Sequence, residues 1–130
     1  MFMLAGRRIL IVEDSPVVAP FTVSVLEDLG CTAVGPAPTL ASARELIEND
    51  TFDAAIMDVH IRGERVFGLC DLLEARGVPF LLTSGYADWQ IPDELQDRPR
   101  LQKPYTFDQL RDALSAVLAA APPRPAAIAG

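Results

Sequence analysis

The sequence predicts an α/β protein in which a parallel β-sheet carries helices on both faces. Short apolar segments alternate five times with longer amphipathic segments, and strands that alternate with helices in this way pair in parallel. The short segments are continuously apolar, as in strands buried on both faces. The 130 residues, 50% of them hydrophobic and 22% charged, suit one domain with a proper core.

The first strand is expected at residues 9–12, an apolar run that leads directly into two carboxylates. Ser15 and Pro16 are typical of a helix start, because serine caps free N–H groups and proline fits the first turn. Gly30 ends this first predicted helix. Its apolar stripe is predicted to consist of Val18, Phe21, Val25 and Leu29.

The second unit is predicted as a strand over residues 31–35 and a helix over residues 39–48. The third unit is a strand over 53–58, which is apolar up to its terminal carboxylate, and a helix over 66–76 that stops at Gly77. The residues expected to face inward from these two helices are Leu40, Ala43, Leu46, Ile47, Leu69, Leu72 and Leu73.

The last two units differ in regularity. The fourth strand is expected at residues 79–83, and Pro92 in the segment that follows predicts a short or irregular fourth helix. A short strand at 100–102 precedes the final helix at 107–118. The proline-rich residues 121–130 are predicted to be a disordered extension of a domain spanning residues 1–120. The inward-facing residues of the final helix are expected to be Leu110, Leu114, Val117 and Leu118.

Five such units suit the flavodoxin-like (βα)5 fold with the sheet order 2-1-3-4-5, because crossovers between parallel strands are right-handed almost without exception. Ligands of these sheets bind beyond the carboxyl ends of the strands, near the point where the strand order reverses. The residues that close the predicted strands should therefore share one edge. They are Glu13, Asp14, Asp58, Thr83, Ser84 and Lys103.

Three carboxylates at one edge repel one another by roughly 4 kcal/mol for each close pair at an effective dielectric constant near 20. Lys103 offsets only part of this repulsion, so we expect either a bound cation or raised pKa values. Oxygen ligands in a small hydrated site favour Mg²⁺ over Ca²⁺. With that ion bound, one carboxylate could attack a phosphoryl group whose oxygens are held by Lys103 and the Ser84 hydroxyl.

The ordered motifs Ile11-Val12-Glu13-Asp14, Met57-Asp58, Ser84-Gly85 and Lys103-Pro104 resemble the response-regulator receiver family of two-component systems. The resemblance covers about residues 7–119. It implies that Asp58 is the phosphoacceptor of a His-to-Asp phosphorelay and that the domain is not itself an enzyme.

The resemblance also assigns the surrounding residues. Asp14 would bind Mg²⁺ directly, Glu13 through water, and His60 through its backbone carbonyl. Ser84 would be the switch hydroxyl and Lys103 the phosphate-binding lysine, joined to Pro104 by a cis peptide bond.

Three features depart from the family pattern, one of which is the short stretch between Ser84 and Lys103 that Pro92 interrupts. Residues 59–65 lack the usual Met-Pro, and Arg100 stands where the family has an aromatic switch residue. The pattern is similar to stand-alone receivers that work with HWE-type sensor histidine kinases. The implied partners are such a kinase or a phosphotransfer protein, a downstream protein target and a second copy in a homodimer.

The composition argues against several other classes. A net charge of −7 disfavours nucleic acid and anionic membranes, and the N-terminus lacks the order of a secretory signal, so a cytoplasmic protein with reduced Cys31 and Cys70 is expected. A phosphorylation-independent docking module on this fold stays open. A haloacid-dehalogenase-type phosphatase would need an Asp-x-Asp pair after the first strand. A flavin or nucleotide binder would need a loop rich in Gly, Ser or Thr at that place. The sequence instead has Glu13 and Asp14 there, which argues against both classes.

Overall fold

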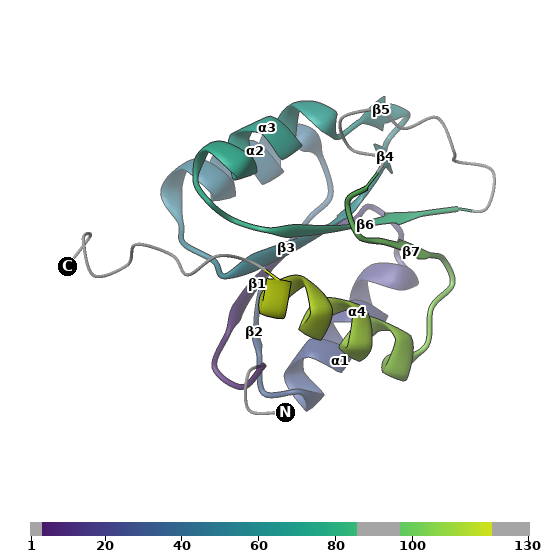
Figure 1. The fold of residues 1–130 in the computed structure, drawn as a ribbon. Coiled ribbons are helices and arrows are strands. Elements are labelled where there is room, and N and C mark those ends of the chain that lie inside the picture. Colours follow the sequence, from purple (N-terminus) through teal and green to yellow (C-terminus); the bar gives the residue numbers. More distant parts are fainter. Residues whose placement is uncertain (1–3, 86–96, 121–130) are drawn as a thin grey trace.

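A five-stranded parallel sheet forms the centre of the molecule, with the strand order β2-β1-β3-β6-β7. The computed structural model describes residues 4–85 and 97–120 (Figure 1). This order is the predicted 2-1-3-4-5, so the flavodoxin-like fold is confirmed. The strands are β1 (Arg8–Val12), β2 (Thr32–Ala37), β3 (Ala54–Asp58), β6 (Phe80–Ser84) and β7 (Arg100–Gln102).

Within residues 4–85 and 97–120, two helices cover each face of the sheet. On one face, α1 (Val18–Asp28) packs beside α4 (Phe107–Ala120), and on the other α2 (Leu40–Asn49) packs beside α3 (Phe67–Ala75) (Figure 1). No helix among the described residues is long and apolar enough to cross a membrane.

The central strand β1 contributes to a separate hydrophobic core on each face. Ile9 and Ile11 belong to the core under α1 and α4, whereas Leu10 and Val12 belong to the core under α2 and α3. Because successive side chains of a strand point to opposite faces, every residue of such a strand must be apolar. The strands consequently carry polar groups mainly at their ends.

The first helix packs against the core through Val18, Val25 and Leu29, as predicted, but not through Phe21. Its buried residues are Ala19, Thr22, Val25 and Leu26, whereas Phe21 is exposed (39%), so the prediction for Phe21 was wrong. The hydroxyl groups of Thr22 and Tyr105 lie 2.6 Å apart in a buried hydrogen bond. This bond allows the polar Thr22 to be buried, although hydrophobicity alone predicted that Phe21 would be.

The helix start lies close to the prediction. The assigned helix begins at Val18, but the Ser15 carbonyl already accepts a hydrogen bond from the Ala19 N–H (3.1 Å). The Ser15 hydroxyl accepts a second from the Val18 N–H (3.0 Å). Ser15 thus satisfies free N–H groups of the first turn, as its residue type predicted.

The segment after β3 forms an unpredicted hairpin of β4 (His60–Ile61) and β5 (Glu64–Arg65). Strand β2 also extends further than predicted, to Ala37, past a cis Gly35–Pro36 peptide. The predicted short fourth helix falls largely at residues 86–96, and the predicted disordered tail at 121–130; both lie outside the described residues.

The corrected face of α1 predicts unequal costs for two substitutions. Leu26→Ala should lower the free energy of unfolding by about 2–5 kcal/mol, because it opens a cavity in the core. Phe21→Ala should cost about 1 kcal/mol or less, since the ring is exposed and makes one tilted contact with Tyr105. Urea unfolding of both variants would measure the difference, and equal losses would contradict this placement of α1.

Candidate functional site

The structure brings the three strand-end carboxylates together. Glu13 and Asp14 follow β1, and Asp58 is the last residue of β3. One carboxylate oxygen from each of the three lies within 4.8 Å of the others. Glu13 and Asp58 are buried, while Asp14 is half-buried. Parallel strands end at one edge of the sheet, and neighbours β1 and β3 place their acidic ends side by side.

Lys103, the only lysine of the chain, lies among these carboxylates. Its Nζ is 2.6 Å from Asp58 Oδ2 and 3.4 Å from Glu13 Oε1. Burial alone would lower the pKa of Lys103, but the hydrogen bonds and charges of Asp58 and Glu13 outweigh it and raise the pKa above its ordinary value. Lys103 is therefore a fixed positive charge in the site.

The surroundings of Glu13 disfavour its ionised form. Burial raises the pKa of the Glu13 carboxyl, and the negative charge of Asp58 raises it further. The Ser15 N–H, which donates to Glu13 Oε2 (3.0 Å), and Lys103 act in the opposite direction without reversing the shift. The ionised site thus holds more negative charge than Lys103 balances.

Backbone N–H groups orient the other two carboxylates. The His60 N–H donates to Asp58 Oδ1 (3.2 Å), and the Arg62 N–H donates to Asp14 Oδ2 (2.9 Å). Carboxylate oxygens have lone pairs beyond these single bonds. Three hard oxygen donors with excess negative charge are a suitable ligand set for Mg²⁺, so this cluster could bind a metal.

Ser84 and His60 lie at the same edge. Ser84 is the half-buried last residue of β6, next in sequence to Thr83, which pairs with Asp58. Its carbonyl accepts a hydrogen bond from the Lys103 N–H (2.8 Å), and the Lys103–Pro104 peptide is cis, as the resemblance implied. The hydroxyl role of Ser84 and the carbonyl role of His60 stay predictions. Arg100, at the position of the family's aromatic residue, is exposed on β7.

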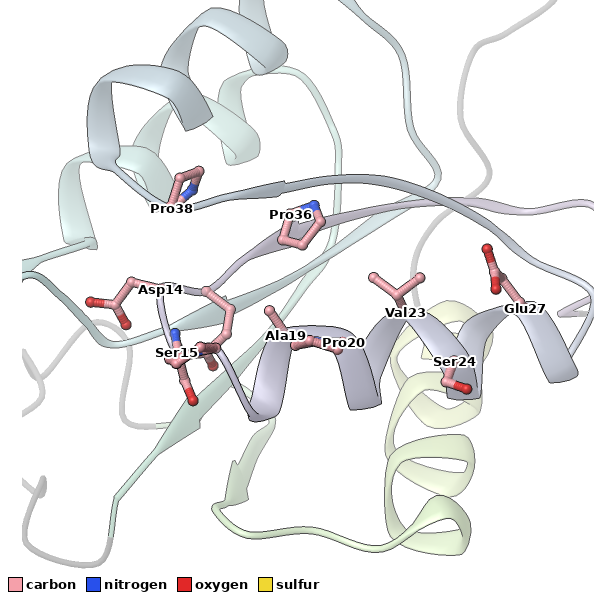
Figure 2. A pocket seen from close by; sticks show the side chains of 11 residues that line it. Asp14, Ser15, Ala19, Pro20, Val23, Ser24, Glu27, Pro36 and Pro38 are labelled. Atoms are coloured by element: carbon pink, nitrogen blue, oxygen red, sulfur yellow. Dashed lines mark hydrogen bonds between the residues drawn. The ribbon is translucent and has the colours of Figure 1, made fainter.

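The acidic end of the site opens into a groove of about 530 Å³ between α1 and the chain around the end of β2 (Figure 2). Asp14 and Ser15 lie at one end, and Ala19, Pro20 and Val23 extend along the α1 wall (Figure 2). The surface beside the carboxylates is therefore hollowed rather than closed.

Sequence reasoning missed two residues that shape the site. Arg62 gives Asp14 its N–H donor, and the only available signal was Gly63, since glycine is common in tight hairpin turns. Tyr105 joins the chain after Lys103 to Thr22 of α1. Burial raises the pKa of the Tyr105 hydroxyl. Its place next to Lys103-Pro104 carried no pattern that predicts this bond.

The position of Lys103 predicts a pH-dependent loss of stability in Lys103→Met. At pH 7 without metal, the free energy of unfolding of the variant should be about 3 kcal/mol lower than that of the unsubstituted protein, because the buried carboxylates lose their cation. The loss should shrink as the pH falls toward 5: the pKa of Glu13 is raised in the folded state, and removal of Lys103 raises it further, so the folded protein takes up this proton before the unfolded chain does.

Denaturant unfolding between pH 5 and 8 would measure this dependence. Arg44→Met, which removes an exposed positive charge on α2, is the matched control. A loss that grows as the pH falls would contradict the electrostatic account.

Comparison with known proteins gives the same assignment. A family model described as the response regulator receiver domain matches residues 9–115. The solution structure of SdrG from Sphingomonas melonis Fr1 is 40% identical, with a TM-score of 0.79 over 88% of this chain and 98% of that one.

A second similar structure is the receiver domain of the sensor histidine kinase PA1611 from Pseudomonas aeruginosa PAO1, which has a magnesium ion coordinated in its active-site cleft. It is 26% identical, with a TM-score of 0.74 over 89% of this chain and 100% of that one. No curated protein sequence matches significantly. Because the family model matches most of the sequence, the chain belongs to the response regulator receiver family.

Proposed function

We propose that this receiver domain accepts a phosphoryl group on Asp58 and that Glu13, Asp14 and Asp58 hold the Mg²⁺ the reaction needs. The observation that carries the proposal is the position of Asp58 at the carboxyl edge of the sheet. Its Oδ2 is 2.6 Å from Lys103 Nζ, and two further carboxylates offer oxygens within 4.8 Å. An ordinary strand-end aspartate needs neither neighbour.

In the proposed transfer, a carboxylate oxygen of Asp58 attacks phosphorus, and the bond from phosphorus to the donor's imidazole nitrogen breaks. The electron pair of that bond stays on the nitrogen, and an acyl phosphate forms on Asp58. The metal would neutralise charge on the transferred oxygens.

Lys103 and Ser84 have complementary roles in this proposal. The Lys103 ammonium, which pairs with Asp58 before transfer, can follow the negative charge onto a phosphoryl oxygen. The Ser84 hydroxyl, at the end of the adjacent strand, would donate to another. Positioning and charge stabilisation are the main contributions of the protein.

We infer that the donor is a sensor histidine kinase, of the HWE type by the sequence resemblance, or a phosphotransfer protein. The output would pass through contacts with another protein. A structure of SdrG in a BeF3-activated conformation, 41% identical to this chain, supports a phosphorylation-dependent role. A docking module that works without phosphate would have no need for the buried charges around Asp58.

Phosphorylation should be confined to Asp58. Incubation with acetyl phosphate and Mg²⁺ should add one phosphoryl mass to the intact protein, and Asp58→Asn should gain none because it lacks the nucleophilic oxygen. Intact-mass spectrometry would measure both. Asp71→Asn, an exposed aspartate on α3, is the control and should be modified normally. The same mass gain on Asp58→Asn would rule out the assignment.

Asp14→Asn should separate repulsion from metal binding. Without metal, its melting temperature should rise, because one of the repelling carboxylates becomes neutral. Excess Mg²⁺ should stabilise the unsubstituted protein by about 2.7 kcal/mol at 100 times Kd, and most of that gain should disappear in the variant.

Melting curves in chelator and in Mg²⁺ would decide, with Asp28→Asn, exposed at the end of α1, as the matched control. Equal Mg²⁺ responses from Asp14→Asn and the unsubstituted protein would remove Asp14 from the metal site.

A further inference from the structure

The hairpin after the proposed phosphoacceptor has an unusual turn. Its two turn residues, Arg62 and Gly63, have φ angles of 53° and 82°, the signature of a two-residue type I′ turn. Glycine adopts such angles readily, whereas a residue with a side chain adopts them at a conformational cost. Contacts of Arg62 elsewhere must offset that cost.

Arg62 makes two hydrogen bonds to other loops at the carboxyl edge of the sheet. Its backbone N–H donates to Asp14 Oδ2 (2.9 Å), and its side-chain Nε donates to the Pro38 carbonyl (3.1 Å). Asp14 and Pro38 belong to opposite walls of the groove at the same end (Figure 2). One exposed residue thus connects the loops that follow β1, β2 and β3.

We propose that Arg62 is a positioning residue for Asp14 in Mg²⁺ binding. The Nε–carbonyl bond anchors the hairpin to the loop after β2, and the anchored hairpin holds its N–H against Asp14. With Oδ2 held, the carboxylate is fixed beside the oxygens of Glu13 and Asp58. This inference rests on the proposed function, since it assumes that the cluster binds Mg²⁺.

Charge and position predict opposite effects for Arg62. If the guanidinium acted only as a positive charge near three carboxylates, its removal would strengthen Mg²⁺ binding. If it positions Asp14, its removal should weaken binding, because outer-shell hydrogen bonds orient the ligands of a metal. The sign of the change therefore distinguishes the two roles.

Two variants separate the hydrogen bond from the charge. Arg62→Gln and Arg62→Met both remove the positive charge and have similar length. Gln places an N–H donor as many bonds from the backbone as Arg Nε, whereas Met places a methyl group there. We expect R62M to bind Mg²⁺ about tenfold more weakly than R62Q by isothermal titration calorimetry.

Amide hydrogen exchange gives a readout that needs no metal. In chelator, the amide of residue 62 should exchange faster in R62M than in R62Q, because its hydrogen bond to Asp14 loses the anchor. Arg65→Met, which removes a positive charge from the same hairpin and a contact with the Phe67 ring, should not weaken Mg²⁺ binding. Arg62→Gly, which suits the left-handed backbone, should also weaken binding and replaces R62M if that variant fails to fold.

The outcomes are distinct. Equal Mg²⁺ affinities and equal exchange in R62M and R62Q would overturn the positioning role, and equally strengthened binding in both would assign Arg62 the role of a charge alone. If the unsubstituted protein binds no Mg²⁺, the proposed function fails, and this inference fails with it. Weaker binding and faster exchange in R62M than in R62Q, with R65M unaffected, would support it.

Discussion

The contact between Lys103 and Asp58 is the interaction on which the site depends. Both side chains are largely removed from water, with exposed fractions of 18% and 9%, and a buried charge without a partner is far more costly than a paired one. The contact also joins two strands that are not neighbours, since Asp58 ends β3, Lys103 follows β7, and β6 lies between them. Without Lys103, Asp58 and Glu13 would lose the ammonium group that contacts both of them.

The fold makes this concentration of charge tolerable. Each central strand fills two cores, so polar groups are confined mainly to strand ends, and parallel strands bring those ends to one edge. Lys103 relieves part of the repulsion among the carboxylates locally, and burial of apolar residues elsewhere offsets the rest. The pKa of Glu13 is raised first by burial and then by the negative charge of Asp58, so part of the repulsion remains.

The alternation of strands and helices predicted the strand order, and the residues that end the apolar runs predicted the meeting of Glu13, Asp14, Asp58 and Lys103. The sequence did not predict which of two adjacent α1 residues is buried: Phe21 is more hydrophobic than Thr22, yet Thr22 is buried and hydrogen-bonded to Tyr105, 83 residues away. The hairpin at Arg62 was also missed, since its bonds reach Asp14 and Pro38 across the sheet edge. Such contacts leave no local periodicity.

The charge balance of the site also sets an order for the proposed reaction. Lys103 is the only ammonium that the sequence offers against three clustered carboxylates, so an approaching phosphoryl group, itself anionic, meets net repulsion. A divalent cation held by these oxygens would remove that repulsion and leave Lys103 free to follow the charge onto the new acyl phosphate. In the proposed reaction the acidic cluster would therefore do more than hold the metal: it would make transfer to Asp58 conditional on the metal being present, because without the cation the same carboxylates would repel the phosphoryl group.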